Sequence, residues 1–351
     1  MMKLTQKYQK IIRIFLEKGI MHSSDVYDEA IKNNEEVSLI TIKRALSEMV
    51  REGFLNISGS GRSTEYTIAS YGRALADVDA KHYCAIEPDK RYGMNRHNFD
   101  ILSAMSSDIF TDDELEKLHS ATNEYIRRTN DLPASIQKKE LERLVIELSW
   151  KSSKIEGNTY TLMDTEKLIL ENKEAIGHSR QEARMILNHK DAFAYIHQNS
   201  SQFKSITRKN IEELHAILVK DMDVGVGLRK KPVGITGSKY LPLDNVYQIT
   251  EAIESLAMAV SKTRAPYAKA LIALLSISYI QPFEDGNKRT GRLMANALLL
   301  SHSLAPLSYR SIDEGDYKNA ILVFYELNSI MPMKKIFIDQ YDFAARNYAV
   351  K

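Results

Sequence analysis

The sequence has very little cysteine and no long hydrophobic run. Its 351 residues include a single cysteine, Cys84, which excludes an internal disulfide and any cysteine metal cluster. Charged side chains interrupt the first twenty residues, where a signal peptide would lie, and no membrane span is visible. The sequence therefore predicts a cytoplasmic protein with no membrane association.

A marked excess of one charge is also absent. The chain has 48 Lys and Arg against 46 Asp and Glu, a formal net charge of +2, and 44% of its residues are apolar. This composition and length predict a soluble globular protein of two domains. The nine histidines show no His-x-x-x-His spacing or other ligand pattern, although His189 and His302 could approach a site formed elsewhere in the chain.

The most informative segment is residues 281–292, which read Gln-Pro-Phe-Glu-Asp-Gly-Asn-Lys-Arg-Thr-Gly-Arg. The stretches before and after it, 270–280 and 293–300, are nearly apolar all round. Such stretches form buried helices, so the loop between them would be held rigidly. The alternative is a Gly-Asn turn between two core helices, with solvated basic residues around it.

The residue types of this loop suit a polyphosphate. Gly286 and Asn287 allow backbone amides to turn toward a ligand at the start of the second helix. Positive charge comes from Lys288, Arg289 and Arg292. Asp285 offers a hard oxygen donor of the kind that Mg²⁺ accepts beside phosphate oxygens. The loop therefore predicts a site for a magnesium nucleotide, with Asp285 as the metal ligand.

The segment resembles the signature of the Fic (Fido) family, His-Pro-Phe-x-Asp-Gly-Asn-Gly-Arg-x-x-Arg. It agrees at Pro282, Phe283, Asp285, Gly286, Asn287, Arg289 and Arg292. The resemblance implies that the loop binds Mg-ATP and that AMP is transferred to a Ser, Thr or Tyr hydroxyl of a protein target. The nucleotide-binding residues that it implies are Phe283, Asp285, Gly286, Asn287, Lys288, Arg289 and Arg292.

Two positions depart from that signature. The family's general base is the leading histidine, and here that position is Gln281, whose amide cannot collect a proton near neutral pH. General-base catalysis contributes about a hundred- to ten-thousand-fold in rate, so transfer should be weak or lost while ATP binding survives. Lys288 replaces a glycine, as in the related Doc kinases, but Arg292 is present and Doc-like sequences lack it.

A second motif lies upstream, at residues 152–158. Leu141, Leu144, Val145 and Leu148 have helical spacing, which predicts a helix at about 135–157 that ends with Gly157 as its C-cap. The motif resembles the inhibitory signature of Fic proteins, with Ser152, Glu156 and Gly157 in the key positions. The resemblance implies that Glu156 pairs with Arg292 and so restrains ATP binding.

Between the two motifs, residues 227–242 predict a short β-hairpin, because apolar residues alternate before a Gly-Ser turn. In its place along the chain the segment resembles the family's flap, whose edge strand pairs with the target chain. The flap residues that this implies are Val233, Gly234, Ile235, Thr236 and Gly237. A surface hairpin that covers the core is equally compatible with the local sequence.

The first seventy residues have a different pattern, which predicts three short helices and a hairpin. Ser23 and Ser38 are the expected N-caps, and the whole looks like a winged helix-turn-helix with residues 38–51 as recognition helix. Ten basic and nine acidic residues give this part a net charge of +1, whereas a strong nonspecific DNA binder would be more basic. The DNA-contact candidates are Thr41, Lys43, Arg44 and Arg62. A protein-interaction winged helix is an equal alternative.

The predicted organisation is a winged helix at 1–70, a connector at 71–103, and a Fic domain at 104–351. The second part is mainly α, a helical bundle with one hairpin, and helical patterns cover 160–198, 208–222, 246–262 and 314–328. Three functions remain open: a Fic-type transferase with weak activity, a nucleotide-sensing pseudoenzyme that regulates transcription through DNA, and a Doc-like protein kinase. A homodimer is compatible with each.

Overall fold

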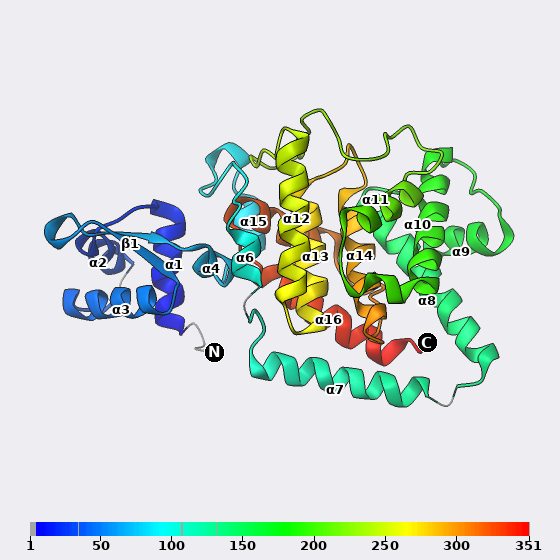
Figure 1. Ribbon diagram of the computed structural model, residues 1–351, viewed down its shortest axis with the longest axis horizontal. Coiled ribbons are helices and arrows are strands. Elements are labelled where there is room, and N and C mark those ends of the chain that lie inside the picture. Colours follow the sequence, from blue (N-terminus) through cyan, green and yellow to red (C-terminus); the bar gives the residue numbers. More distant parts are fainter. Residues whose placement is uncertain (1–4, 34, 107, 131, 351) are drawn as a thin grey trace. The chain divides into compact units, whose positions relative to one another are not determined.

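The computed structural model describes residues 5–33, 35–106, 108–130 and 132–350 (Figure 1). The fold is mainly helical, as the sequence predicted. The chain divides into two compact units. The first comprises residues up to Ile109 together with Ile235–Leu241 and Asn319–Met333, and the second comprises the remainder. No helix among the described residues combines the length and the apolar character that crossing a bilayer requires.

The first unit begins with the three helices and the hairpin that the sequence predicted. They are α1 (Gln6–Lys18), α2 (Ser23–Lys32), α3 (Leu39–Arg51), β1 (Leu55–Ser58) and β2 (Glu65–Ile68), with a short 3-10 helix, η1 (Gly61–Ser63), between the strands. The two strands are antiparallel, and an isolated bridge adds Met21 beside Tyr66. Ser38 caps α3, because its hydroxyl accepts from the Thr41 amide at 3.2 Å. The prediction for Ser23 is one residue late, since His22 occupies the N-cap position of α2.

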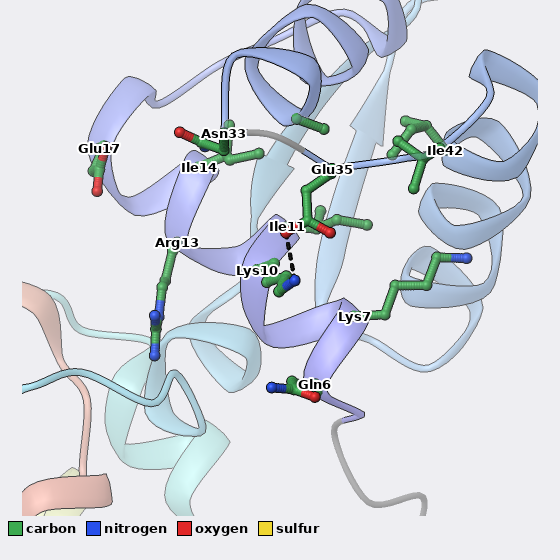
Figure 2. Close-up of a pocket in the computed structure, with 12 residues that line it drawn as sticks. Gln6, Lys7, Lys10, Ile11, Arg13, Ile14, Glu17, Asn33, Glu35 and Ile42 are labelled. Carbon is green, nitrogen blue, oxygen red and sulfur yellow. Dashed lines mark hydrogen bonds and ion pairs between the residues drawn. The ribbon is translucent and has the colours of Figure 1, made fainter.

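A groove of about 480 Å³ lies on the first unit between α1 and the segment that leads into α3 (Figure 2). Its floor includes the apolar side chains of Ile11, Ile14 and Ile42. Its rim is charged, and an ion pair joins Lys10 to Glu35 across it. The cations on this rim are therefore at least partly neutralised by acids of the same unit.

The rest of the first unit is built from short helices, where the sequence predicted an ordered connector. They are α4 (Ser70–Ala74), α5 (Ala80–Ala85), η2 (Pro88–Lys90) and α6 (Ile101–Met105). A buried carboxylate, Glu326, ties this stretch to a later segment of the chain by accepting from the Tyr83 hydroxyl at 2.8 Å and from Arg91 at 3.3 Å.

The second unit is a helical bundle. It contains α7 (Asp112–Thr129), α8 (Ala134–Ile155), α9 (Leu162–Glu171), α10 (Arg180–Gln198), η3 (Ser200–Lys204), α11 (Arg208–Leu218), α12 (Val246–Lys262), α13 (Pro266–Ile280) and α14 (Asn287–Ser301). Two further helices, α15 (Glu314–Leu327) and α16 (Met331–Asn347), have residues in both units. The capping box expected before α7 is present, since Thr111 and Glu114 exchange hydrogen bonds of 2.8 and 3.2 Å.

Helices α13 and α14 pack side by side through this bundle (Figure 1). Both are buried over almost their whole length, as their apolar sequences predicted. A Cβ atom on Gly291 would lie 2.8 Å from the Leu274 carbonyl oxygen, so the glycine permits the close approach of the two helices. The loop that joins them is therefore fixed at both ends in the core.

The predicted hairpin at 227–242 does not form paired strands in the structure. The segment is an irregular loop with one turn, in which the Ser238 amide donates to the Ile235 carbonyl at 3.2 Å. Amides of the expected return strand are used elsewhere: Lys239 donates to Glu326 and Leu241 to the Asn95 carbonyl. Because those donors are taken, the two arms cannot form a ladder, and the two-stranded sheet of this chain is the β1–β2 hairpin.

Candidate functional site

The conformation of the loop between α13 and α14 is held by the loop's own side chains. Gln281 ends the helix with φ 51°, and Gly286 precedes α14 with φ 80°, so both residues are left-handed. The Asn287 side chain then closes the loop: its oxygen accepts from the Phe283 amide, and its nitrogen donates to the Phe283 carbonyl, each at 2.9 Å. The backbone at the start of α14 is thus organised without any ligand.

Gln281 uses both ends of its side-chain amide inside this loop. Its nitrogen donates to the Ser278 carbonyl at 2.6 Å, and its oxygen accepts from the Asn287 side chain at 2.9 Å. The side chain therefore supports the loop, and neither end of an amide offers a basic nitrogen.

His215, which the sequence did not single out, lies next to the loop but cannot serve as a substitute base. Its Nε2 donates to the Asp285 carbonyl at 3.0 Å, and its ring stacks on Phe283 with centroids 3.6 Å apart. The side chain is fully buried, and burial lowers the pKa of His215 to about 4. It therefore packs the underside of the loop as a neutral ring.

Two buried arginines supply the positive charge of the site. Arg289 is 2% exposed and donates to Asp285 at 3.1 Å, whereas Arg292 is completely buried. In the part of the chain that the structure describes, the NH1 atom of Arg289 lacks a hydrogen-bond partner, and the guanidinium carbon of Arg292 lies 5.4 Å from the centre of the Tyr317 ring. Unmet donors in a buried cationic cluster suit an oxyanion, so the residues present fit a bound phosphate.

The end of α8 places a carboxylate at this cluster. Gly157 has φ 98°, its amide donates to the Lys154 carbonyl at 2.9 Å, and the next amide donates to the Ser153 carbonyl at 3.1 Å. These two hydrogen bonds make a Schellman end with Gly157 in the left-handed position just after the cap, so the predicted C-cap is one residue late. The cap residue itself is Glu156, one residue beyond the end of the helix.

Glu156 is held between two cations, and only 15% of its side chain is exposed. One carboxylate oxygen accepts from Arg292 at 2.9 Å, and the other lies 2.8 Å from the Lys288 ammonium. Burial alone would raise the pKa of the Glu156 carboxyl, but the charges of Arg292 and Lys288 outweigh it and hold the pKa below its usual value. Glu156 is therefore an anion at neutral pH.

Ser152 and His189 complete the surroundings of Arg292. The arginine donates to the Ser152 hydroxyl at 2.8 Å and to the Ser152 carbonyl at 2.9 Å, and His189 Nε2 lies 2.7 Å from the same hydroxyl. Burial and then the nearby arginine charges put the pKa of His189 well below its usual value, so the ring is neutral. His302 does not reach the site, because it follows the far end of α14, about 22 Å along the helix.

The Lys288–Glu156 pair predicts an energetic coupling that an exposed pair would not show. In a double-mutant cycle with Lys288→Met and Glu156→Gln, we expect a coupling of about 1 kcal/mol in the free energy of unfolding, because Glu156 is largely desolvated. The measurement is urea unfolding of the four proteins. The exposed pair Lys209–Glu213, with 3.7 Å between its charged atoms, is the control. A coupling no larger than that of the control would contradict the assignment.

The two neutral, fully buried histidines predict a loss of stability in mild acid. The unfolded chain binds protons at His189 and His215 near pH 6.5, whereas the folded chain does not, so stability falls as pH drops below that value. Each contributes a slope of about 1.4 kcal/mol per pH unit between about pH 6 and 5. Denaturant unfolding at several pH values measures this slope. His189→Gln should reduce it and the exposed His82→Gln should not, and equal slopes in all three proteins would refute the prediction.

The predicted metal ligand and the predicted flap residues lie outside the buried cluster. Asp285 has a side chain that is 65% exposed, and the described residues contain no group of three or more His, Cys, Asp or Glu side chains arranged to hold a metal ion. Val233 and Gly234 belong to the same unit as the loop, whereas the last three expected flap residues, 235–237, belong to the first unit.

The sequence comparisons agree with this geometry. The Fic/DOC family matches residues 205–299. A protein adenylyltransferase Fic of Nematostella vectensis is 31% identical over 173 residues, which is 48% of this chain and 40% of that protein. The protein of the same name in Drosophila melanogaster is 34% identical over 157 residues, which is 44% of this chain and 32% of that protein. The match thus spans less than half the length of these relatives.

Solved structures support the fold. A Fic domain containing signaling protein from Bacteroides thetaiotaomicron aligns with a TM-score of 0.56 and 21% identity, and the alignment covers 65% of this chain and 94% of that one. Fic-1 from C. elegans aligns with a TM-score of 0.56 and 17% identity over 70% of this chain and 79% of that one. From the family match we conclude that residues 205–299 belong to a domain of the Fic/DOC family, and the solved structures share its helical fold.

Proposed function

We propose that this chain binds Mg-ATP at the α13–α14 loop, and that it is a protein adenylyltransferase whose AMP transfer is weak because the base is missing. The observation that carries the proposal is the carboxylate of Glu156 between Arg292 and Lys288. It occupies a buried anion site whose cations would otherwise face a phosphate. Homologues named protein adenylyltransferase Fic support ATP as the anion.

The residues present would hold the nucleotide by its phosphates. The unmatched NH1 donor of Arg289, the guanidinium of Arg292 and the amides at the start of α14 would donate hydrogen bonds to phosphate oxygens. Asp285, which is exposed and already 3.1 Å from Arg289, would be the protein ligand of Mg²⁺. When bound, the metal neutralises charge on the phosphate oxygens.

The transfer itself requires a proton acceptor. An oxygen of a Ser, Thr or Tyr side chain of the target would bond to the α-phosphorus, the bond from that phosphorus to the bridging oxygen would break, and pyrophosphate would leave. The hydroxyl proton must then go to a base. Gln281 cannot take it, and His215 is buried beneath the loop, so solvent is left as the acceptor and the rate is low.

Glu156 would restrain binding by direct competition. Any phosphate that reaches the NH2 atom of Arg292 and the ammonium of Lys288 must displace the carboxylate from both. Two like charges cannot share these donors, so ATP binding and the Glu156 contact exclude each other.

Labelled ATP distinguishes the possible reactions. The Glu156→Gly protein is incubated with Mg-ATP labelled on the α- or the γ-phosphate, and label is sought on the protein itself and on lysate proteins. We expect α-label only, slow in this protein and faster once Gln281→His is added. Transfer of γ-label alone would instead identify the kinase alternative, and absence of transfer even after Gln281→His would contradict the proposal.

A second candidate function is nucleotide-dependent regulation through DNA. It is favoured by the exposure of Lys43 and Arg44 on α3 and of Arg62 between the two strands, because exposed cations can reach DNA phosphates. Thr41 supports it less, because its hydroxyl lies 2.9 Å from that of Ser38. Fluorescence anisotropy with duplex DNA, for the natural protein and a Lys43→Ala/Arg44→Ala variant, tests this candidate. Equal affinities of the two proteins would dismiss it.

A further inference from the structure

Arg229 is a buried cation that no part of the proposed function uses. Only 2% of the residue is exposed. Its guanidinium donates to three backbone carbonyls: to Gln281 at 2.6 Å, to Lys231 at 2.8 Å, and to Leu243. Its own amide donates to the Pro282 carbonyl at 3.0 Å.

These acceptors come from three separate segments. Lys231 and Leu243 lie at the two ends of the loop that was expected to form the flap. Gln281 and Pro282 are the first two residues of the signature loop. The Arg229 side chain therefore joins both ends of the first loop to Gln281, and its backbone amide adds a bond to Pro282. All of these residues belong to the second unit.

A guanidinium is suited to this arrangement and an ammonium is not. Its N–H groups point in a fixed, planar fork, so three acceptors in different directions can be held at once. A lysine at the same place is a point charge on a flexible stem. Burying a charge is costly, and such a charge is worth retaining where it specifies a geometry.

The geometry that it specifies is that of position 281. Gln281 has φ 51°, a left-handed conformation that is strained for a non-glycine residue and persists only where the surroundings hold it. The hydrogen bond from Arg229 to the Gln281 carbonyl stabilises this backbone conformation from outside the loop.

The same bonds fix the start of the neighbouring loop. Val233 and Gly234 follow Lys231 after one intervening residue, Pro232, and in the described part of the chain no hydrogen bond uses their backbone groups. An extended peptide could therefore pair with them.

We propose that Arg229 is a positioning residue: it sets the distance between the peptide-pairing segment at 233–234 and residue 281, beside which the target hydroxyl would lie. The inference depends on the proposed function for its effect on transfer. The hydrogen bonds from Arg229 to the two loops, called the tether below, can be tested without ATP.

The first test is amide hydrogen exchange of the full chain, comparing the natural protein with Arg229→Lys and with the partly exposed control Arg310→Lys. We expect exchange in peptides covering 228–243 and 277–287 to accelerate at least tenfold in Arg229→Lys only, with the other helices of the second unit unchanged. Unchanged exchange in those two peptides would overturn the tether. Faster exchange throughout the unit would also overturn it, because it would show a general structural role.

The second test places Arg229→Lys or the control Arg310→Lys, each separately, in the Glu156→Gly/Gln281→His background. It follows self-labelling with α-labelled ATP. Arg229→Lys should lower the labelling rate at least tenfold while the ATP dissociation constant changes less than threefold. An unchanged rate, or a matching loss of ATP affinity, would overturn the positioning role. Absence of ATP binding in the parent background would refute the proposed function instead, and the exchange result would still decide the tether.

Discussion

Replacing Gln281 with histidine in the Glu156→Gly protein is expected to raise AMP transfer by about a hundred- to ten-thousand-fold. Histidine has its ordinary pKa near 6.5 and can take the hydroxyl proton, which an amide cannot. The backbone at this position is left-handed, with φ 51°, and histidine is among the non-glycine residues enriched in that conformation. The new side chain therefore requires no change of the loop backbone.

The rate is measured as α-label incorporated per minute into the protein and into lysate proteins. Gln281→Asn in the same background is the matched control, since it retains an amide and adds no base. Both substitutions lose the bonds from Gln281 to Ser278 and Asn287, so both will lower stability by a similar amount. Equal transfer rates for the histidine and asparagine variants would show that a missing base is not what limits this site.

Removing the Glu156 side chain is expected to destabilise the protein and to improve ATP binding. Without it Arg292, which is completely buried, loses its carboxylate partner, and breaking a buried pair in this way costs about 3 kcal/mol. Phosphate can then fill the anion site. At an ATP concentration a hundred times the dissociation constant, binding should return about 2.7 kcal/mol of that loss.

The measurement is urea unfolding of the natural protein, Glu156→Gln and Glu156→Gly, each with and without Mg-ATP. Glu174→Gly, at an exposed acid in the loop after α9, is the control. The natural protein and the control should gain little from ATP. A Glu156 variant that is as stable as the natural protein, or one that ATP does not stabilise, would contradict the assignment of this carboxylate to the phosphate site.

Features governed by local rules could be predicted from the sequence. The left-handed glycine at the end of α8, the Thr111–Glu114 capping box and the Ser38 cap each depend on residues within a few positions, and all three are present. The contact between Glu156 and Arg292 was expected from the resemblance alone, and the structure brings the two charges to 2.9 Å. Its inhibitory role remains a proposal.

Features set by tertiary partners could not be predicted. The expected flap hairpin is an irregular loop because Glu326 and Asn95 take the amides of its return strand. The helical pattern over 160–198 corresponds to two helices, and the first, α9, ends at Asn172, which has a φ of 55°. The pattern alone gave no sign of where the first helix ends.

Charged side chains with distant partners also left no signal in the sequence. Lys288 pairs with a residue 132 positions earlier, at a position where the family signature has glycine. Arg229 bonds to carbonyls, and carbonyls carry no side-chain identity that a sequence pattern could reveal. Both residues become functional candidates only when the fold has brought their partners together.

The central claim is that the buried cations beneath Glu156 form an ATP phosphate site, and calorimetric titration of Mg-ATP into the Glu156→Gly protein tests it most directly. We predict saturable binding at one site, stronger than in the natural protein and weakened at least tenfold by adding Arg292→Ala, because a charge-assisted hydrogen bond contributes about 1.5–3 kcal/mol. Absence of binding to Glu156→Gly, or binding that Arg292→Ala leaves unchanged, would contradict the claim.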